Sequence, residues 1–274
     1  MPENKVVLIT GANGNLGRKL CRHLEAQGGY ELRLLDLDAA GTPGVIAADL
    51  AVYDETWARH FEGVDAVLHL AAHGSPGIDW RTAQRLNIDL TANVYDAAAL
   101  KGAGRMVFAS SNWVMAGYRF DDVRLTTDLP PRPLNPYGVS KLVGERSGKS
   151  LAERRGVPFI GFRIGYCQGG ENLPGPHMGQ GLWGQRMWLS NRDLCHGWER
   201  AILAEDVRFA VLNLMSDNPG MPWDIDETRR VIGYRPEDGH VALPTDDQAL
   251  RSEALRDKYR LTDGLDRVFA AGEW

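Results

Sequence analysis

The segment GANGNLG, residues 11–17, constrains the fold more than any other part of this sequence. It follows the apolar run KVVLIT (5–10), which is typical of a buried strand, and it leads into residues 15–27, where leucines recur at helical spacing. A glycine-rich turn between a strand and a helix is typical of dinucleotide sites, because the glycines permit a tight turn, a close approach to a pyrophosphate and close helix–strand packing. The helix N-terminus also offers free N–H groups to phosphates. The sequence therefore predicts a dinucleotide site at this turn.

Short apolar runs alternate with helical patterns through the first 165 residues. We expect strands at residues 5–10, 31–36, 44–48, 64–72, 105–110 and 158–164, and helices at residues 15–27, 80–100 and 136–154. Strands separated by helical patterns of this length imply right-handed crossovers and a parallel sheet covered on both faces. The predicted fold class is therefore α/β, a doubly wound parallel sheet (Rossmann-like) with a small C-terminal substrate-binding lobe.

The composition changes after residue 165. Residues 169–184 are rich in glycine and proline, and a loop of that length is more often a binding loop than an idle connection. Beyond it we expect helices at 191–204 and 224–232, a strand at 208–215, and a charged helical tail with no assigned role. Residues 1–165 are thus predicted to form the NAD-binding domain, completed by the strand near 208–215. Residues 166–274 are predicted to form a substrate lobe and tail rather than an independent domain.

Charge and composition exclude several classes of protein. A net charge of −5 gives no reason to expect a nucleic-acid or anionic membrane partner, and no apolar run reaches the roughly 20 residues of a membrane span. The N-terminus lacks the layout of a signal peptide, and Cys21, Cys167 and Cys195 have no spacing that indicates disulfides or zinc. The seven histidines form no ligand pair, so we expect no metal site. A cytoplasmic protein with a small-molecule substrate is predicted.

An acidic residue follows the glycine turn at the spacing that dinucleotide sites use. Asp36 ends the second predicted strand, 19 residues after Gly17, where a carboxylate binds the adenine ribose hydroxyls and repels a 2′-phosphate. This position favours NAD over NADP. Asp49 and Leu50, just past the third strand, are candidates for the edge of the adenine site, with a simple strand-end cap as the equal alternative.

The segment NPYGVSK (135–141) places Tyr137 and Lys141 one helical turn apart. A tyrosine that acts as a base near neutral pH must lose about 3 units from its usual pKa near 10, or roughly 4 kcal/mol. We expect Lys141 and the charge of an oxidised nicotinamide to supply this shift. Ser111, at the end of the fifth strand, is positioned to hold a substrate oxygen while Tyr137 removes its proton. Its neighbour Ser110 is expected to bond to its own backbone.

The order of these segments resembles the extended short-chain dehydrogenase/reductase family, also called the NAD-dependent epimerase/dehydratase family. The matching segments are GANGNLG, Asp36, HLAAH (69–73), Asn87 within NIDLTANV, SSNWVMAG (110–117), YGVSK (137–141) and IGYRP (232–236). The resemblance covers the chain to about residue 238. It implies the catalytic set Ser111, Tyr137 and Lys141, the cofactor NAD, and a homo-oligomer, a dimer or higher, in which helices 80–100 and 136–154 pair.

The same resemblance implies the residues that contact the cofactor. These are Gly11, Asn13, Gly14, Asn15, Leu16, Gly17, Asp36, Leu37, Asp49, Leu50, Leu70, Ala71, Ala72, Asn87, Tyr137, Lys141 and Ile164. Two histidines of the HLAAH segment are separate cases: His69 is expected to be a core residue, whereas His73 lies just beyond the strand and is positioned to face the cofactor.

Within the family, the sequence is most similar to uronate dehydrogenases, which oxidise a hexuronic acid at C1 to a lactone. The similarity rests on FASSN (108–112), RPLNPYGVSK (132–141), RIG (163–165) and QRMWLSNRDL (185–194). It implies that Arg186 clamps the sugar carboxylate, since a guanidinium binds a carboxylate through two hydrogen bonds; the alternative is a surface arginine. The implied substrate residues are Ser75, Ser111, Asn112, Trp113, Tyr137, Gly165 and Arg186.

The pattern departs from these relatives at Trp113, where uronate dehydrogenases carry histidine. Trp80, Trp183 and Trp188 either stack on the substrate or pack in the core. Asn112 and Trp113 replace the acidic pair of the family's dehydratases, and the C-terminal lobe is short for a nucleotide-sugar substrate. We therefore expect NAD-dependent oxidation of a hexuronate-like sugar acid. The alternatives are an epimerase or carbonyl reductase of the same family and a non-catalytic dinucleotide sensor.

Overall fold

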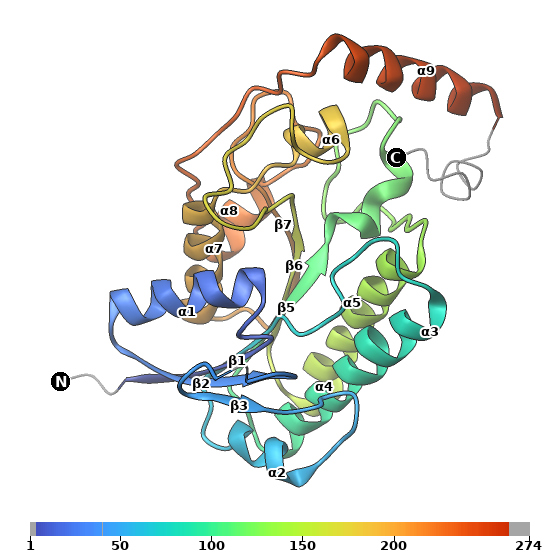
Figure 1. Cartoon of the computed structure of the whole chain (residues 1–274). Helices are drawn as coiled ribbons and strands as arrows, with labels where there is room; N and C mark the ends of the chain where they lie inside the picture. The colour runs from blue at the N-terminus through green and yellow to red at the C-terminus, as the bar shows by residue number, and fades with distance from the viewer. Residues whose placement is uncertain (1–3, 40, 263–274) are drawn as a thin grey trace.

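The structure is a computed structural model that describes residues 4–39 and 41–262. Seven parallel strands form one sheet in the order β3-β2-β1-β4-β5-β6-β7 (Figure 1). The strands are β1 Lys5–Thr10, β2 Tyr30–Asp36, β3 Val45–Ala47, β4 Ala66–His69, β5 Met106–Ser111, β6 Phe159–Ile164 and β7 Phe209–Leu214. The predicted doubly wound fold is confirmed. Strand order reverses between β1 and β4, so the carboxyl ends of these strands define the crevice where such sheets bind ligands.

Helices cover both faces of the sheet (Figure 1). One face carries α1 Asn15–Gln27, α7 Asn191–Leu203 and α8 Asp226–Ile232, and the other carries α2 Glu55–Ala58, η1 Arg59–Phe61, α4 Leu90–Leu100 and α5 Pro136–Arg155. The remaining elements are α3 Trp80–Ala83, η2 Gln84–Asp89, η3 Asn112–Tyr118, α6 Gly181–Arg186 and α9 Asp246–Thr262. None of the helices in these described residues is long and apolar enough to span a membrane.

The central strands are buried on both faces, as their continuous apolar sequences predict. Val7 and Ile9 of β1 point into the core under α1 and α7, whereas Leu8 points into the core under α2, α4 and α5. All three side chains are fully buried. Because neighbouring residues of a strand alternate between its two faces, an unbroken apolar run is what a sheet sandwiched between helices requires.

Several local features differ from the expected elements. The expected helix 80–100 is three segments, α3, the π-helical η2 and α4. The expected strand at 64–72 is shorter, since β4 ends at His69 and the next residues turn to line the crevice. Several short elements were not expected, among them α2, which Asp54 caps by accepting a hydrogen bond from the N–H of Thr56, the turn η1 that follows it, and the buried turn η3. The expected loop 169–184 ends at α6, which begins at Gly181.

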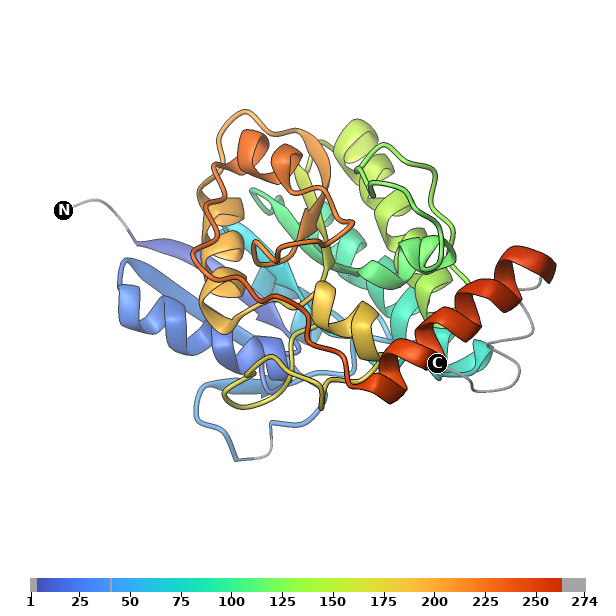
Figure 2. The ribbon, with the colours of Figure 1, turned by 90° about the horizontal axis from the view of Figure 1, so that it is seen from above.

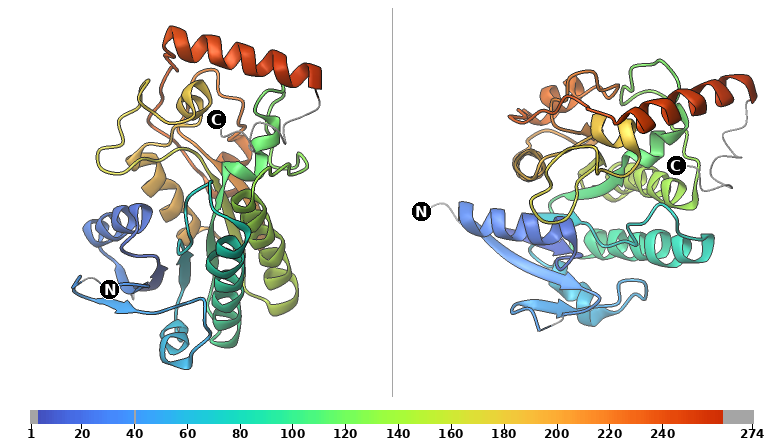
Figure 3. Two further views of the ribbon diagram at one scale, coloured as in Figure 1. Left: turned by 45° about the vertical axis from the view of Figure 1, so that its right-hand side comes forward. Right: turned by 45° about the horizontal axis from the view of Figure 1, so that its top comes forward.

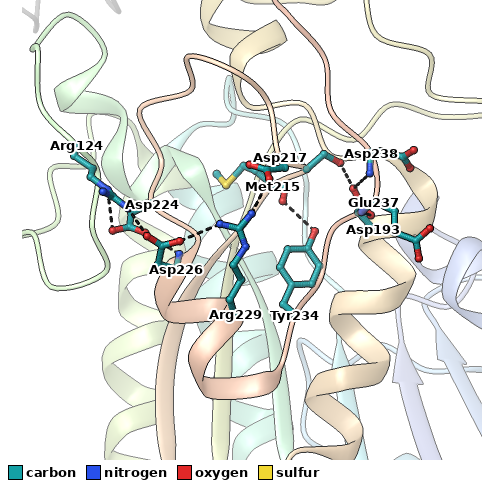
Figure 4. A network of polar contacts seen from close by, with 11 residues as sticks. Arg124, Asp193, Met215, Asp217, Asp224, Asp226, Arg229, Tyr234, Glu237 and Asp238 are labelled. Carbon is teal, nitrogen blue, oxygen red and sulfur yellow. Dashed lines mark hydrogen bonds and ion pairs between the residues drawn. The ribbon is translucent and has the colours of Figure 1, made fainter.

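The IGYRP segment (232–236) connects the C-terminal lobe to the end of β7 through hydrogen bonds (Figure 4). The buried Tyr234 hydroxyl donates to the Met215 carbonyl at 3.0 Å. Asp193 of α7 accepts hydrogen bonds from the N–H groups of Glu237 and Asp238. The charges around Arg229 lie at the surface. After this lobe the chain continues into α9, which packs against α6 on the side of the molecule where the carboxyl ends of the strands lie (Figures 2 and 3).

Candidate active site

A pocket of about 580 Å³ opens at the carboxyl ends of the central strands, in the crevice that the sheet topology defines. It combines the glycine turn after β1 with residues that follow β4, β5 and β6. Of the expected cofactor and substrate residues, it is lined by Gly11, Gly14, Asn15, Leu16, Gly17, Leu70, Ala72, Ser111, Asn112, Trp113, Tyr137, Lys141, Ile164 and Gly165. The structure therefore brings the expected catalytic set and the glycine turn into one cavity.

Local structure sets the position of each catalytic side chain. Ser111 is the last residue of β5, and its Oγ accepts a hydrogen bond from the N–H of Trp113 at 3.2 Å. Asn135 caps α5 by accepting from the N–H of Gly138 at 2.7 Å, and Pro136 occupies the first helical position, so Tyr137 lies in the first turn. Tyr137 forms a hydrogen bond with Ser111. One turn later, Lys141 Nζ lies 5.7 Å from the centroid of the Tyr137 ring.

The electrostatics of this set differ from the sequence expectation. Burial raises the pKa of Tyr137, and the hydrogen bond with Ser111 offsets this rise in part. Burial lowers the pKa of Lys141 to about 7, because the residue is only 4% exposed and the loss of water disfavours its charged form. In the protein alone, burial rather than Lys141 thus sets the pKa of Tyr137, and the expected lowering beside an oxidised nicotinamide stays a prediction. The buried lysine is itself close to losing its charge at neutral pH.

This shift predicts how stability depends on pH. The pKa of Lys141 is about 10.5 unfolded and about 7 folded, so between these values the unfolded chain binds more protons and stability rises with pH. The lysine contributes up to about 1.4 kcal/mol per pH unit. In urea unfolding at pH 7 and pH 9, the wild type should gain stability relative to Lys141→Met as pH rises. Lys149→Met, at a half-exposed lysine of the same helix, is the control: the difference in stability between the wild type and this variant should be the same at both pH values. An equal wild-type-to-K141M difference at both pH values contradicts the shift.

The glycine turn is closed against any side chain. A Cβ at Gly17 would lie 2.2 Å from the Gly11 carbonyl oxygen, and one at Gly11, whose φ is +73°, would lie 2.8 Å from the Ala71 nitrogen. No side chain caps the N-terminus of α1, so its first N–H groups face the pocket unblocked. At the end of β2, Asp36 accepts a hydrogen bond from the Asn13 N–H at 2.9 Å. A close-approach turn, free N–H groups and a fixed carboxylate fit a dinucleotide without a 2′-phosphate.

Other expected cofactor residues have structural partners. Asn87 is buried, accepts from the His73 N–H at 2.8 Å and donates to Ser140 Oγ at 3.0 Å, so it supports the crevice wall. Asp49 accepts from the Ala51 N–H and pairs with Arg85, as a strand-end cap does. Leu50 is buried in the core, and Leu37 is 65% exposed beside Asp36. Contact of these residues with a dinucleotide stays a prediction.

Only some of the residues expected to bind the substrate lie in the catalytic pocket. Asn112, Trp113 and Gly165 line the pocket with the catalytic set, but Ser75 is exposed and accepts a hydrogen bond from the Gly77 N–H. Arg186, at the end of α6, lines a different pocket of about 390 Å³ that lies toward α9. Arg186 therefore does not line the pocket of the catalytic set, and its expected role as the clamp of a sugar carboxylate stays a prediction.

The remaining aromatic and histidine expectations are resolved by packing. Trp183 is buried against Trp223 at 4.3 Å between ring centroids, and Trp188 is buried with its Nε1 donating to the Asn172 carbonyl. Trp80 is 59% exposed on α3, and none of the three lines the catalytic pocket. His69 is a core residue, as expected: it contacts Thr10 and Thr91 through hydrogen bonds, and burial lowers its pKa to about 3.

Two features of the site lay beyond the sequence patterns. The Ser110 hydroxyl donates to Glu145 of α5 at 2.6 Å, so the expectation that it bonds to its own backbone is wrong. Glu145 in turn pairs with Arg163 of β6, and this buried network ties the catalytic strand to the catalytic helix. Gln180, within the glycine-rich loop, also lines the pocket. No periodicity or motif marks either feature, because both depend on segments that only the fold brings together.

Comparison with known proteins agrees with this geometry. The sequence pattern of the family described as "NAD dependent epimerase/dehydratase family" matches residues 7–181. NAD-dependent glucose-6-phosphate dehydrogenase of Haloferax volcanii is 35% identical and covers 89% of this chain and 97% of that protein. L-arabinose 1-dehydrogenase (NAD(P)(+)) of the same organism is also 35% identical, and the match covers 86% of this chain and 98% of that protein. A mutant uronate dehydrogenase of Agrobacterium tumefaciens, complexed with NAD, superposes with a TM-score of 0.71 at 29% identity, over 94% of this chain and 89% of that one.

Proposed function

Because this chain belongs to the NAD dependent epimerase/dehydratase family, we propose that it is an NAD-dependent dehydrogenase that oxidises a sugar at C1 to a lactone, with Tyr137 as the base. The observation that carries the proposal is the convergence of Ser111, Tyr137 and Lys141 with the glycine turn in one pocket. The names of the three relatives support it, since they are dehydrogenases of a sugar, a sugar phosphate and a sugar acid, and one name specifies carbon 1.

The residues have distinct roles in this proposal. Ser111 holds the anomeric hydroxyl, and Tyr137 removes its proton as the phenolate, a form that Ser111, Lys141 and the positive charge of the oxidised nicotinamide stabilise. The glycine turn, the α1 N-terminus and Asp36 hold NAD, which when bound supplies the acceptor for the hydride. A phenolate at Tyr137 favours the protonated form of Lys141, because opposite charges in a buried site stabilise each other.

The experiment is an absorbance assay at 340 nm with the protein, NAD and a panel of aldoses, uronic acids and sugar phosphates. Steady formation of NADH with at least one sugar, together with the matching lactone, is expected. An epimerase would convert sugar without net NADH, and a sensor would bind NAD with neither NADH nor product. Either result across the full panel rejects the proposed dehydrogenase. The substrate predicted from the sequence, a hexuronate, is part of the panel, but Arg186, on which that prediction depends, lines the other pocket.

A further inference from the structure

The buried imidazole of His69 joins three elements where β1 and β4 end. His69 is the last residue of β4 and is 1% exposed. Its Nδ1 lies 2.8 Å from Oγ1 of Thr10, the last residue of β1, and its Nε2 lies 3.1 Å from Oγ1 of Thr91 in α4. Because burial lowers its pKa to about 3, the ring is neutral at pH 7. One of its nitrogen atoms therefore donates a hydrogen bond and the other accepts one.

The partners of Thr10 determine which nitrogen accepts. Thr10 Oγ1 accepts hydrogen bonds from the N–H of Leu70 and the N–H of Ala71, each at 3.2 Å. A hydroxyl oxygen accepts two hydrogen bonds and donates one. Among the described residues, His69 Nδ1 is the partner that remains for the Thr10 hydroxyl hydrogen. His69 thus accepts at Nδ1 and carries its own hydrogen on Nε2, from which it donates to Thr91.

The two N–H groups that Thr10 holds belong to the wall of the dinucleotide crevice. Leu70 and Ala72 line the catalytic pocket, with Ala71 between them. The glycine turn packs directly against this wall, since a Cβ at Gly11 would lie 2.8 Å from the Ala71 nitrogen. The dinucleotide binds in the crevice between the turn and the end of β4. Even a small displacement of residues 70–72 would therefore change the shape of the cofactor site.

We propose that His69 is a positioning residue for NAD, which accepts a hydrogen bond from Thr10 and thereby aims the Thr10 oxygen at the two N–H groups of the crevice wall. His69 acts through Thr10 and contacts neither the cofactor nor the sugar. Loss of this hydrogen bond releases the wall from its place against the glycine turn and weakens NAD binding. The inference rests on the proposed function only for the cofactor that the site holds.

The first test compares the two threonines on either side of the ring. Thr10→Val and Thr91→Val each replace a buried hydroxyl with a methyl group of similar size. In titration calorimetry without a sugar, Thr10→Val should bind NAD about 10-fold more weakly than the wild type, because the N–H groups of the wall lose their acceptor. Thr91→Val removes only the hydrogen bond on the far side of the ring and should bind NAD within about 3-fold. An unchanged affinity in Thr10→Val, or an equal loss in both variants, overturns the inference.

The second test separates positioning from packing. In His69→Asn the side-chain oxygen can take the place of Nδ1 and accept from Thr10, whereas in His69→Gln the amide reaches the place of Nε2 beside Thr91. Asparagine is the smaller side chain and leaves the larger cavity, so packing alone predicts that it is the more damaging change. We expect the reverse for NAD: affinity within about 3-fold of the wild type for His69→Asn and about 10-fold weaker for His69→Gln. Weaker binding by His69→Asn than by His69→Gln overturns the positioning role.

The position of the ring hydrogen is measured directly in the wild type. The spectrum is a long-range ¹H–¹⁵N correlation of protein labelled with ¹⁵N at histidine, with the signals of His69 identified by comparison with His69→Gln. It should show the hydrogen on Nε2 and an unprotonated Nδ1 from pH 5 to pH 8. A hydrogen on Nδ1, or a charged ring at pH 7, overturns the inference.

The two proposals fail differently. NAD affinity is measured without a sugar, so the tests of His69 hold whether or not any sugar yields NADH. If sugars yield NADH and the two threonine variants bind NAD alike, the dehydrogenase stands and the positioning role of His69 is rejected. If the variants behave as expected and no sugar yields NADH, the dehydrogenase is rejected and the positioning role stands.

Discussion

Replacing Tyr137 with phenylalanine is expected to lower kcat by about 1,000-fold while leaving NAD affinity within about 3-fold of the wild type. The variant retains the ring that packs in the pocket and loses only the hydroxyl that bonds to Ser111. Without that oxygen, the described residues that line the pocket leave Ser111 without a neighbouring side chain suited to remove the anomeric proton. The measurements are kcat from absorbance at 340 nm and the NAD dissociation constant from titration calorimetry.

A matched control separates loss of the base from loss of any tyrosine hydroxyl. Tyr118 donates its hydroxyl to the Pro130 carbonyl outside the catalytic pocket, so Tyr118→Phe should retain kcat within about 2-fold. A Tyr137→Phe enzyme that keeps a tenth of the wild-type kcat contradicts the assignment of Tyr137 as base.

The second large effect concerns stability. Arg163 of β6 donates from Nε and Nη2 to Glu145 of α5 at 3.0 Å each, and both side chains are only 4% exposed. Arg163→Met leaves the carboxylate buried with the Ser110 hydroxyl as its remaining partner. Loss of one partner of a buried ion pair lowers the free energy of unfolding by about 3–5 kcal/mol, because the other charge stays uncompensated. Urea unfolding at pH 7 measures the change.

The double variant Glu145→Leu/Arg163→Met decides whether the cost comes from the stranded charge. Removing both charges replaces the pair with apolar side chains of similar size, and such replacements are often close to neutral. We expect the double variant to recover most of the stability that Arg163→Met loses, which appears as a strong coupling in the double-mutant cycle. A double variant as unstable as Arg163→Met shows that packing, rather than charge, accounts for the loss.

The sheet was predictable because each long strand is marked by an apolar run in its own sequence. Runs such as KVVLIT are apolar throughout, and the helices between them keep a regular apolar spacing. The elements that were missed, such as α2 and η3, are short and lack such spacing. α2 depends on the Asp54 cap and on burial of Trp57, while η3 depends on packing against the N-terminal part of α5. Tertiary contacts, which a local pattern does not contain, determine both.

The same distinction applies to the site. The motif order predicted the family and the residues that line the pocket around Tyr137, because each motif ends a strand or begins a helix at the crevice. The positions of Arg186 and Gln180 were not predictable, since they depend on how the glycine-rich loop enters α6. The pKa of Lys141 was also missed, because its burial beside Phe108 is a property of the folded core.

Oxidation at C1 by this site is tested most directly with an aldose that carries deuterium at C1. With the wild-type enzyme and NAD, the reduced cofactor should carry one deuterium on its nicotinamide ring, and the product should be the deuterium-free lactone. Reduced cofactor without deuterium would contradict the proposed reaction. Recovery of every labelled aldose of the panel unchanged would contradict it as well.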